Sequence, residues 1–154
     1  MVRKNAVEQI PALIVTRPDR RETLCTLLAD ALHDDNVLVS MATNDLIVEL
    51  MVTEPDQVEL LWERFGDIFQ DRSEDVSNVV ISEIPTLMAA DPNRVESLWE
   101  VLMDAFTDSD IYVRMAAVNQ IPAVILLRPG SAETLCTCLF NALRDSEQAV
   151  REKA

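Results

Sequence analysis

The stretch that decides the fold reads Asp108-Ser109-Asp110-Ile111-Tyr112-Val113-Arg114, and a close copy follows as Asp145-Ser146-Glu147-Gln148-Ala149-Val150-Arg151. The two copies lie 37 residues apart, since 145 − 108 = 37. The same interval relates valines, turn aspartates and prolines along the chain: Val2, Val39, Val76, Val113 and Val150; Asp34, Asp71, Asp108 and Asp145; Pro18, Pro55, Pro92 and Pro129. A fixed period of this length indicates a row of similar structural units.

Apolar residues between these marks fall at helical spacing, so each period is expected to hold two helices. The first helix of each unit carries the columns Leu24/Leu61/Leu98/Leu135, Leu28/Phe65/Leu102/Leu139 and Leu32/Phe69/Phe106/Leu143. The second carries Val2/Val39/Val76/Val113, Ile10/Ile47/Ile84/Ile121 and Leu13/Leu50/Leu87/Val124. Both helices therefore have one apolar face.

These marks predict helices at 2–15, 20–33, 37–52, 57–69, 75–89, 94–106, 111–127, 131–143 and 147–154. Pro11, Pro85 and Pro122 fall inside three of them and are expected to kink them. One helix pair is too small to bury its own apolar faces, but stacked pairs share a continuous core. The sequence thus predicts an all-α fold, an α-solenoid of antiparallel helix pairs that forms a right-handed superhelix with a period of 37 residues.

We expect a single domain over residues 1–154. It would begin with the second helix of a first unit at 1–16 and continue with helix pairs at 20–52, 57–89, 94–127 and 131–154. By this phasing the chain opens in the middle of one unit and stops early in another. That is what an excised fragment or an engineered repeat protein would do.

The order of first helix, turn Asp and then Val-Arg opening a second helix resembles the HEAT repeat family over the whole chain. The resemblance implies a ladder of polar contacts between the turn Asp and the Arg of neighbouring units. Arg3, Arg114 and Arg151 match that Arg, whereas Ser40 and Ser77 replace it. The stretches 2–11 and 34–39 are also similar in style to scaffold and regulatory subunits of protein phosphatases 2A and 4.

Composition excludes several classes of function. Twenty-seven Asp and Glu against thirteen Lys and Arg give a net charge of −14, which repels nucleic acid and anionic membrane surfaces. Two glycines are too few for a Gly-rich phosphate loop, and no stretch has the apolar character of a signal peptide or a membrane span. Three cysteines without paired spacing fit a reducing compartment, so we expect the cytosol, with the nucleus as the alternative.

Residues that could carry catalysis or bind a metal are few. His33 is the sole imidazole, and we interpret it as a cap at a helix C-terminus. Cys136 and Cys138 point to different sides of a helix, so they are not expected to share a metal ion. Cys25 and Cys136 fall in the column of Trp62 and Trp99, which favours packing. We expect no enzyme activity, no metal and no cofactor; a HEAT-like lyase or glycosylase would need a catalytic cluster or a basic groove.

The charge is segregated, with no Lys or Arg between Glu22 and Glu63. The turns inside the units collect acids: Asp34, Asp35, Asp71, Glu74, Asp75, Asp108, Asp110, Asp145 and Glu147. Two interpretations stay open, an acidic ridge that docks a basic partner and a solvated edge of helix caps. Under the first, the four turn aspartates at the 37-residue interval cap helices, and Asp35, Glu74, Asp75 and Asp110 are free to bind.

A second candidate surface is the exposed side of the second helices. Its columns are Met1/Leu38/Asp75/Tyr112, Lys4/Met41/Asn78/Met115 and Glu8/Asp45/Ser82/Asn119. Because Tyr and Met are enriched at interface centres, we predict a protein-binding groove that includes Leu38, Met41, Asp45, Tyr112, Met115 and Asn119. Ordinary surface scatter, or packing if the helix phase is off by one position, would explain the same pattern.

These features lead to two expectations about function. The first is a non-catalytic scaffold for protein–protein interaction whose partner is a basic segment or, by the phosphatase likeness, a phosphatase-related subunit. The alternative is an engineered or excised repeat protein that has no partner of its own and self-associates through uncapped ends. Those ends would expose Val2, Ile10 and Leu13 at one terminus and Leu135, Leu139 and Leu143 near the other.

Overall fold

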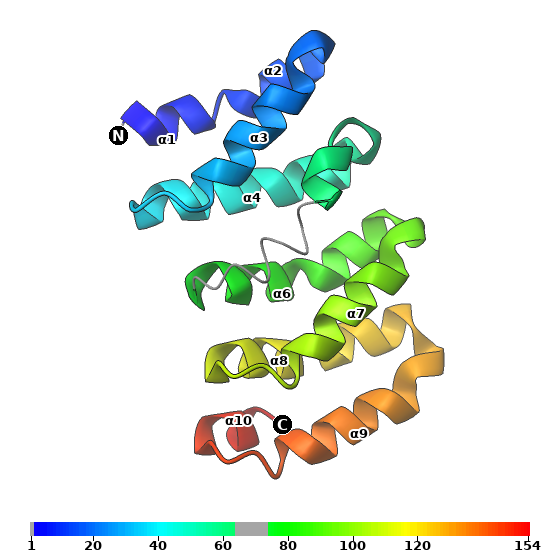
Figure 1. Cartoon of the computed structure of the whole chain (residues 1–154). Helices are drawn as coiled ribbons and strands as arrows, with labels where there is room; N and C mark the ends of the chain where they lie inside the picture. The colour runs from blue at the N-terminus through cyan, green and yellow to red at the C-terminus, as the bar shows by residue number, and fades with distance from the viewer. Residues whose placement is uncertain (1, 64–73) are drawn as a thin grey trace. The chain divides into compact units, whose positions relative to one another are not determined.

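The computed structural model describes residues 2–63 and 74–154, without the side chains of 74–79, and every regular element in these ranges is helical (Figure 1). The prediction of an all-α chain is confirmed for this part of the protein. Contacts divide the chain into two compact units, Met1–Val76 and Ser77–Ala154. Each unit is described by itself below.

Unit 1 contains four α-helices with described bounds and two short 3₁₀ turns. They are α1 (Val2–Val7), α2 (Ile10–Thr16), η1 (Pro18–Arg20), α3 (Arg21–Ala31), α4 (Val37–Thr53) and η2 (Pro55–Gln57). Residues 59–63 are helical as well, so the helix predicted at 57–69 begins two residues later, and its part 64–69 lies outside the described residues. Helix α3 packs against both α2 and α4, and α1 packs against α4.

Unit 2 repeats this order of elements. It contains α6 (Glu74–Ala90), which begins at the boundary between the units, then η3 (Pro92–Arg94), α7 (Val95–Ala105), α8 (Ile111–Leu127), η4 (Pro129–Ser131), α9 (Ala132–Ala142) and α10 (Gln148–Lys153). Helix α8 packs against α7, α9 and α10. Helices α4, α6 and α8 have 17 residues each and begin at residues 37, 74 and 111.

Each proline of the 37-residue series begins a 3₁₀ turn that follows one helix and precedes the first helix of the next predicted pair. Pro18, Pro55, Pro92 and Pro129 are the first residues of η1, η2, η3 and η4. Proline suits this position because the first residue of a helical turn has no partner for its N–H group. The helices predicted to begin at 20, 94 and 131 therefore start one residue later, after the 3₁₀ turn.

The predicted helix 2–15 is wrong as a single element, because the structure has a turn at Glu8 and Gln9 between α1 and α2. The Gln9 N–H donates to the Ala6 carbonyl at 3.2 Å, a contact that tightens the chain into a 3₁₀-like turn. Pro11 follows and has no N–H for the Val7 carbonyl. Pro85 and Pro122, in contrast, lie inside the continuous helices α6 and α8.

The apolar columns form the cores of both units. Among the second helices Val39, Val113 and Val150 are buried, and so are Ile47, Ile84, Leu50, Leu87 and Val124. The first helices contribute Leu28, Leu61, Leu98, Leu102 and Leu135. The predicted columns thus supply much of the core, although Ile10, Leu24 and Ile121 are only partly buried. Phe65, Phe69 and Val76 lie outside the described side chains.

The two predicted apolar ends differ. Val2 is 84% exposed and Leu13 is exposed, as expected for an uncovered face, whereas Ile10 is partly buried. The opposite end does not fit the expectation: Leu135 is fully buried, and Leu139 packs against the cluster of Val118, Ala142 and Val150, to which α10 contributes Val150. Only Leu143 of that predicted trio is exposed, because the other two are covered within unit 2.

No helix among the described residues combines the length and the apolar character needed to cross a membrane.

Candidate protein-binding surfaces

The turn aspartates organise the entry into the second helices, but they do so two residues before the cap. In three turns an Asp Oδ1 accepts a hydrogen bond from the N–H two residues later: Asp34 from Asn36 at 2.9 Å, Asp108 from Asp110 at 2.8 Å and Asp145 from Glu147 at 2.9 Å. Each Asp thereby forms the side-chain turn that sets the direction of the following helix. Asp71 lies outside the described residues.

The helix caps themselves are other residues. Asn36 caps α4 by accepting from the Leu38 N–H at 3.0 Å, and Asp110 caps α8 by accepting from the Tyr112 N–H at 2.7 Å. The second carboxylate oxygen of Asp110 is buried without a hydrogen-bond partner in the described part of the chain. The expectation that Asp108 caps the helix is therefore wrong, because Asp110 occupies the cap position, and binding by Asp110 stays a prediction.

The other acids predicted to bind are placed differently from one another. Asp35 is exposed in the turn before α4. Glu74 and Asp75 are the first two residues of α6, where negative charge complements the helix dipole, and their side chains lie outside the description. Among these three acids, the structure therefore describes the side chain of Asp35 alone, and it is exposed. A role of the acidic ridge in binding stays a prediction.

One contact of the kind that the HEAT resemblance implies occurs in each unit, Arg3 with Asp34 in unit 1 and Arg114 with Asp145 in unit 2. In unit 2 the Arg114 guanidinium donates two hydrogen bonds to Asp145, from Nε to Oδ2 at 2.8 Å and from Nη2 to Oδ1 at 2.9 Å. Its Nη1 also donates to the carbonyls of Asp108 and Ser109, so this one side chain holds two successive turns together. The Arg114 hydrogen bonds lower the pKa of Asp145 below its ordinary value.

In unit 1 the equivalent contact has fewer hydrogen bonds and is more exposed. Arg3 Nη1 donates one hydrogen bond to Asp34 Oδ2 at 2.8 Å, and the Arg3 side chain is 69% exposed, against 12% for Arg114. Ser40, which replaces the Arg on α4, donates its hydroxyl to the Leu32 carbonyl at the end of α3. The serine therefore stabilises a contact inside its own helix pair.

Sequence reasoning missed a second polar contact, which joins the C-terminal end of α8 to α7, whereas Arg114 lies near the N-terminal end of α8. Arg128 donates from Nη1 and Nη2 to the two carboxylate oxygens of Glu96, at 2.7 and 3.0 Å. Its guanidinium carbon also lies 4.7 Å from the centre of the Trp99 ring. A signal was available, because Glu22, Glu59, Glu96 and Glu133 follow the 37-residue interval.

The predicted binding face on the second helices is exposed on α4. Leu38 is 66% exposed and Met41 54% exposed, and Asp45 is exposed beside them. The apolar pair therefore lies on the surface of unit 1, as the spacing predicts.

On α8 the predicted face is exposed at two of its three residues, and its role in binding stays a prediction. Tyr112 and Asn119 are exposed, but Met115 is half-buried and packs against the cluster of Val118, Ala142 and Val150. Met115 therefore belongs to the edge of the core, since the face that it occupies turns toward α10 in unit 2.

Another polar residue that sequence reasoning missed is Asn44. It occupies the column of Val7, Ile81 and Val118, all of which are buried aliphatic residues. Asn44 is buried too, and its amide nitrogen has no hydrogen-bond partner in the described residues. An unpaired amide in this place costs stability, since it leaves water without a replacement bond.

The histidine and the cysteines take structural positions. His33 Nδ1 lies 3.2 Å from the Ala29 carbonyl oxygen near the end of α3, in agreement with the predicted capping role. Cys25 and Cys138 are buried, and burial raises the pKa of both thiols, whereas Cys136 is exposed, unlike the packing role predicted for it. In the residues that the structure covers, no group of three His, Cys, Asp or Glu side chains could hold a metal ion.

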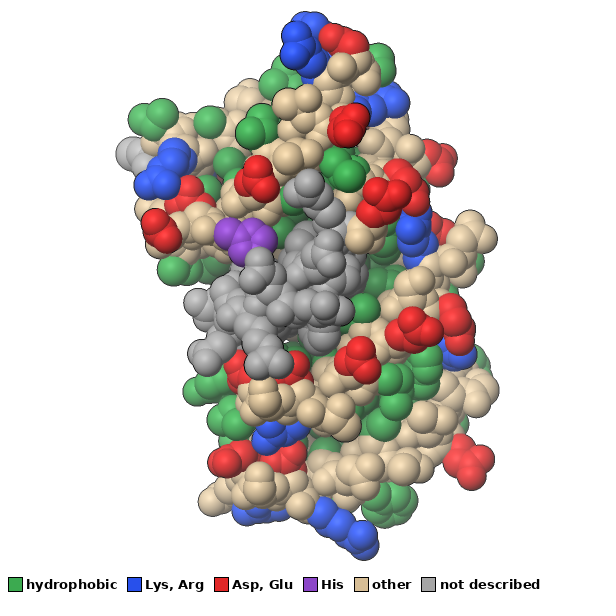
Figure 2. Space-filling view, viewed as in Figure 1, with side chains coloured by type: hydrophobic (Ala, Val, Ile, Leu, Met, Phe, Trp, Pro, Cys, Tyr) green, Lys and Arg blue, Asp and Glu red, His purple; other side chains and the backbone are tan. Residues whose placement is uncertain are grey.

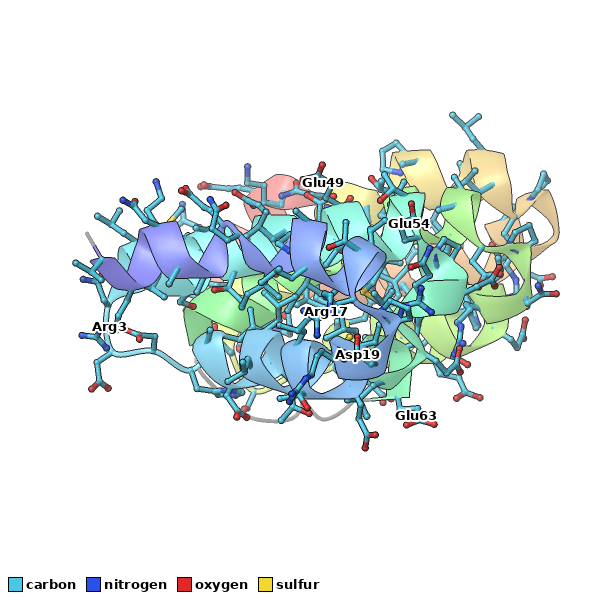
Figure 3. All side chains as sticks on the ribbon, turned by 90° about the horizontal axis from the view of Figure 1, so that it is seen from above. Arg3, Arg17, Asp19, Glu49, Glu54 and Glu63 are labelled. Carbon is cyan, nitrogen blue, oxygen red and sulfur yellow. The ribbon has the colours of Figure 1, made fainter. Side chains whose placement is uncertain are left out.

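On the face seen in Figure 2, acids are spread over both units, and Lys and Arg lie near α2 in unit 1 and also at the end of unit 2 that carries α9 and α10. Figure 3, which looks from above, places Glu49 on the side of α4 that points away from α3 and Glu63 on the opposite side. Unit 1 therefore carries negative charge on both of its helix layers. No protein-family model matches this chain, and a search of curated proteins finds no match either.

Proposed function

We propose that this chain is a non-catalytic HEAT-type scaffold that binds another protein through the exposed side of its second helices. The observation that carries the proposal is the exposed apolar pair Leu38 and Met41 on α4, whose opposite side is fixed in the core by Val39 and Ile47. A rigid helix that presents large apolar side chains to solvent fits protein recognition, because such side chains supply most of the binding energy at interfaces.

We further propose that the helix pairs stack as a right-handed α-solenoid with a period of 37 residues. Two contacts support this arrangement, Arg3 with Asp34 and Arg114 with Asp145. Each joins the Val-Arg of a second helix to the turn of the next unit in sequence, which is the neighbour-to-neighbour contact that a stack of repeats needs. Small-angle X-ray scattering of the chain tests the arrangement, since a stack of pairs gives an elongated distance distribution and two freely moving units do not.

The scaffold role is tested by affinity capture. The chain is attached to a resin through Cys136, which is exposed on α9, and incubated with cell lysate at low salt. A partner with complementary charge should be retained and then released at raised salt, because exposed charges are screened over about 8 Å at physiological ionic strength.

The matched control for this capture is Val113→Asp, which places a carboxylate in the core of unit 2 while it changes the net charge by only one. A protein that binds any acidic or unfolded chain should be retained both by the resin with the parent chain and by the resin with Val113→Asp. If no protein is retained by the folded chain above the level of this control, the scaffold proposal is wrong.

A second candidate function, self-association without another partner, is favoured by the exposed apolar residues of the first two helices, Val2, Leu13 and Val15. Sedimentation equilibrium over a wide concentration range tests it. Association that weakens in the variant Leu13→Asp/Val15→Asp would support this candidate, and a monomer at every concentration would exclude it.

A further inference from the structure

The outer side of α4 carries a row of exposed residues, Leu38, Met41, Asp45, Glu49 and Val52, called here the α4 stripe. Their spacing of three or four residues keeps them on one side of the helix. From Leu38 to Val52 the row is about 21 Å long, since a helix rises 1.5 Å per residue. The stripe therefore has apolar side chains at both ends and two carboxylates in the middle.

The stripe is not used to build the core of unit 1. The buried residues of α4, which include Val39, Ile47, Leu50 and Met51, lie on its other sides. Helices α1 and α3 are the helices of unit 1 that pack against α4. Figure 3 shows Glu49 on the side away from α3. Within the described residues the stripe is thus an unpartnered helix face.

The two carboxylates of the stripe, Asp45 and Glu49, are exposed. In the described residues neither Asp45 nor Glu49 forms an ion pair, and no Lys or Arg occurs between Glu22 and Glu63. Their charge is therefore uncompensated by nearby sequence, so the stripe attracts cations and repels phosphate groups.

The equivalent faces of two other second helices lack this combination. On α1, Lys4 pairs with Glu8 at 3.6 Å, so the charge there is balanced. On α8, the residues that match Asp45 and Glu49 are Asn119 and Ala123, which are neutral. Exposed apolar side chains together with unpaired acids distinguish α4 from both.

We propose that the α4 stripe docks a cationic amphipathic helix of a partner protein, an inference that rests on the proposed scaffold function. The apolar residues of the partner helix pack on Leu38 and Met41 at one end and on Val52 at the other. Its Lys or Arg side chains pair with Asp45 and Glu49 between them. A straight row of 21 Å fits a helix of about four turns, because the partner's own apolar residues recur at the same spacing.

The chemistry of the stripe decides among the classes of partner. Nucleic acids and anionic lipid surfaces carry negative charge, which Asp45 and Glu49 repel. A neutral apolar segment would leave both carboxylates desolvated without a partner, at a cost in binding energy. A cationic amphipathic helix satisfies both parts of the stripe at once. Because one helix covers less surface than a standard interface, binding should be in the micromolar range, about 1–100 μM.

The test uses a synthetic helical peptide of about 20 residues, with Leu on one side at helical spacing and Lys along the flanks, in fluorescence anisotropy titrations of the whole chain. The parent should bind it at about 20 mM salt and more weakly at about 150 mM. A second peptide with Glu in place of every Lys should not bind. Absence of binding by the first peptide, or equal binding of both, overturns the inference.

Variants locate the binding. Asp45→Asn/Glu49→Gln should weaken binding about tenfold, as loss of two charge-assisted contacts does. The matched control Glu22→Gln/Asp56→Asn makes the same change of net charge at exposed positions of α3 and η2 and should change the affinity less than about twofold. If the control weakens binding as much as the stripe variant, the attraction is general and the inference is wrong.

The apolar part of the stripe needs its own variant. Leu38→Ser/Met41→Ser removes exposed side chains, so the fold should persist, and binding should fall about tenfold or more. The control is Leu27→Ser on α3, which removes one exposed leucine from the other helix layer. Unchanged affinity in the stripe variant means that the peptide does not dock there, which overturns the inference.

Failure of this inference is distinguishable from failure of the scaffold function. A lysate protein retained by the parent and equally by the stripe variants would keep the scaffold function and move its surface elsewhere, for example to Tyr112 on α8. Self-association of the parent that disappears in Leu38→Ser/Met41→Ser, without peptide binding, would show that a second copy covers the stripe, which contradicts the cationic partner.

Discussion

Residues 2–16 and 113–127 begin alike, with Val-Arg, and both contain Gln-Ile-Pro-Ala, yet they form different structures. The first stretch breaks at Glu8 and Gln9 into α1 and α2, and the second runs without a break as part of α8. Val2 is 84% exposed, and Val113, its counterpart, is 2% exposed. Sequence identity at these positions therefore does not decide whether the helix is continuous.

The difference lies in what surrounds each helix. Helix α8 packs against α7, α9 and α10, and its first turn is capped by Asp110. Within the described residues α1 packs against α4, and α2 packs against α3 and the η1 turn. A proline inside a helix costs about 3 kcal/mol. Packing on several sides offsets this cost at Pro122, and a break relieves it before Pro11.

The largest difference between the two regions should appear at the ladder arginines. Arg114→Ala removes two hydrogen bonds to Asp145 and two to turn carbonyls in a partly buried place, and should cost about 3 kcal/mol of unfolding free energy. Arg3→Ala removes one exposed contact and should cost less than about 1 kcal/mol. Urea unfolding monitored by circular dichroism measures both losses of unfolding free energy. Equal losses would contradict the expectation that the Arg114 contact contributes more stability than the Arg3 contact.

The paired valines come next. Val113→Ala should cost about 2 kcal/mol, because it empties a buried position, whereas Val2→Ala should change stability by less than about 0.5 kcal/mol. Thermal and urea unfolding of the two single variants provide the test, with each as the control of the other. A substantial loss in Val2→Ala would mean that the N-terminal valine is covered in solution, which would support self-association.

The sequence predicted where the helices lie better than how each helix ends. The regular columns Leu28/Leu102 and Val39/Val113 were sufficient to identify the buried faces, because helical spacing and burial depend on the same geometry. The break at Gln9 could not be predicted from Pro11, since Pro122 has the same neighbours in sequence and the opposite outcome. Tertiary packing decides that outcome, and local sequence does not contain it.

The candidate surfaces were predicted to a similar extent. Spacing placed Leu38 and Met41 on the outer side of α4, but it could not separate them from Met115, which α10 partly covers. Composition identified acidic turns but not which acid caps, because Asp108 and Asp110 differ only in their distance from the first helical residue. The Arg128 contact with Glu96 joins residues 32 apart, so the only sequence signal for it was the series of glutamates at the 37-residue interval.

A smaller effect should follow from Pro11→Ala, which restores the N–H that the Val7 carbonyl lacks. If the proline alone causes the break, α1 and α2 should join into one helix, with a stability gain of about 1 kcal/mol or less. Backbone chemical shifts of residues 7–11 measure the change by NMR. Shifts that still report a turn at Glu8 and Gln9 would show that the sparse packing around α1 maintains the break.

The smallest effect should come from titration of the ladder. Because Arg114 lowers the pKa of folded Asp145, this carboxylate stabilises the fold fully above its unfolded pKa, about 3.9, and loses that contribution as the pH falls through the lowered folded value. The stability difference between the parent and Asp145→Asn should therefore shrink below about pH 4. Urea unfolding at pH 7 and pH 3 tests this, and a difference that is constant with pH would contradict it.

The stacking of Arg128 on Trp99 also gives the protein an optical property. The chain has two tryptophans, and they fall one in each unit: Trp62 is buried in unit 1, and Trp99 lies beneath the Arg128 guanidinium in unit 2. Intrinsic fluorescence therefore contains a separate emitter for each half of the molecule. With Trp62→Phe or Trp99→Phe, the emission of the remaining indole would reveal whether the two halves melt together or in sequence.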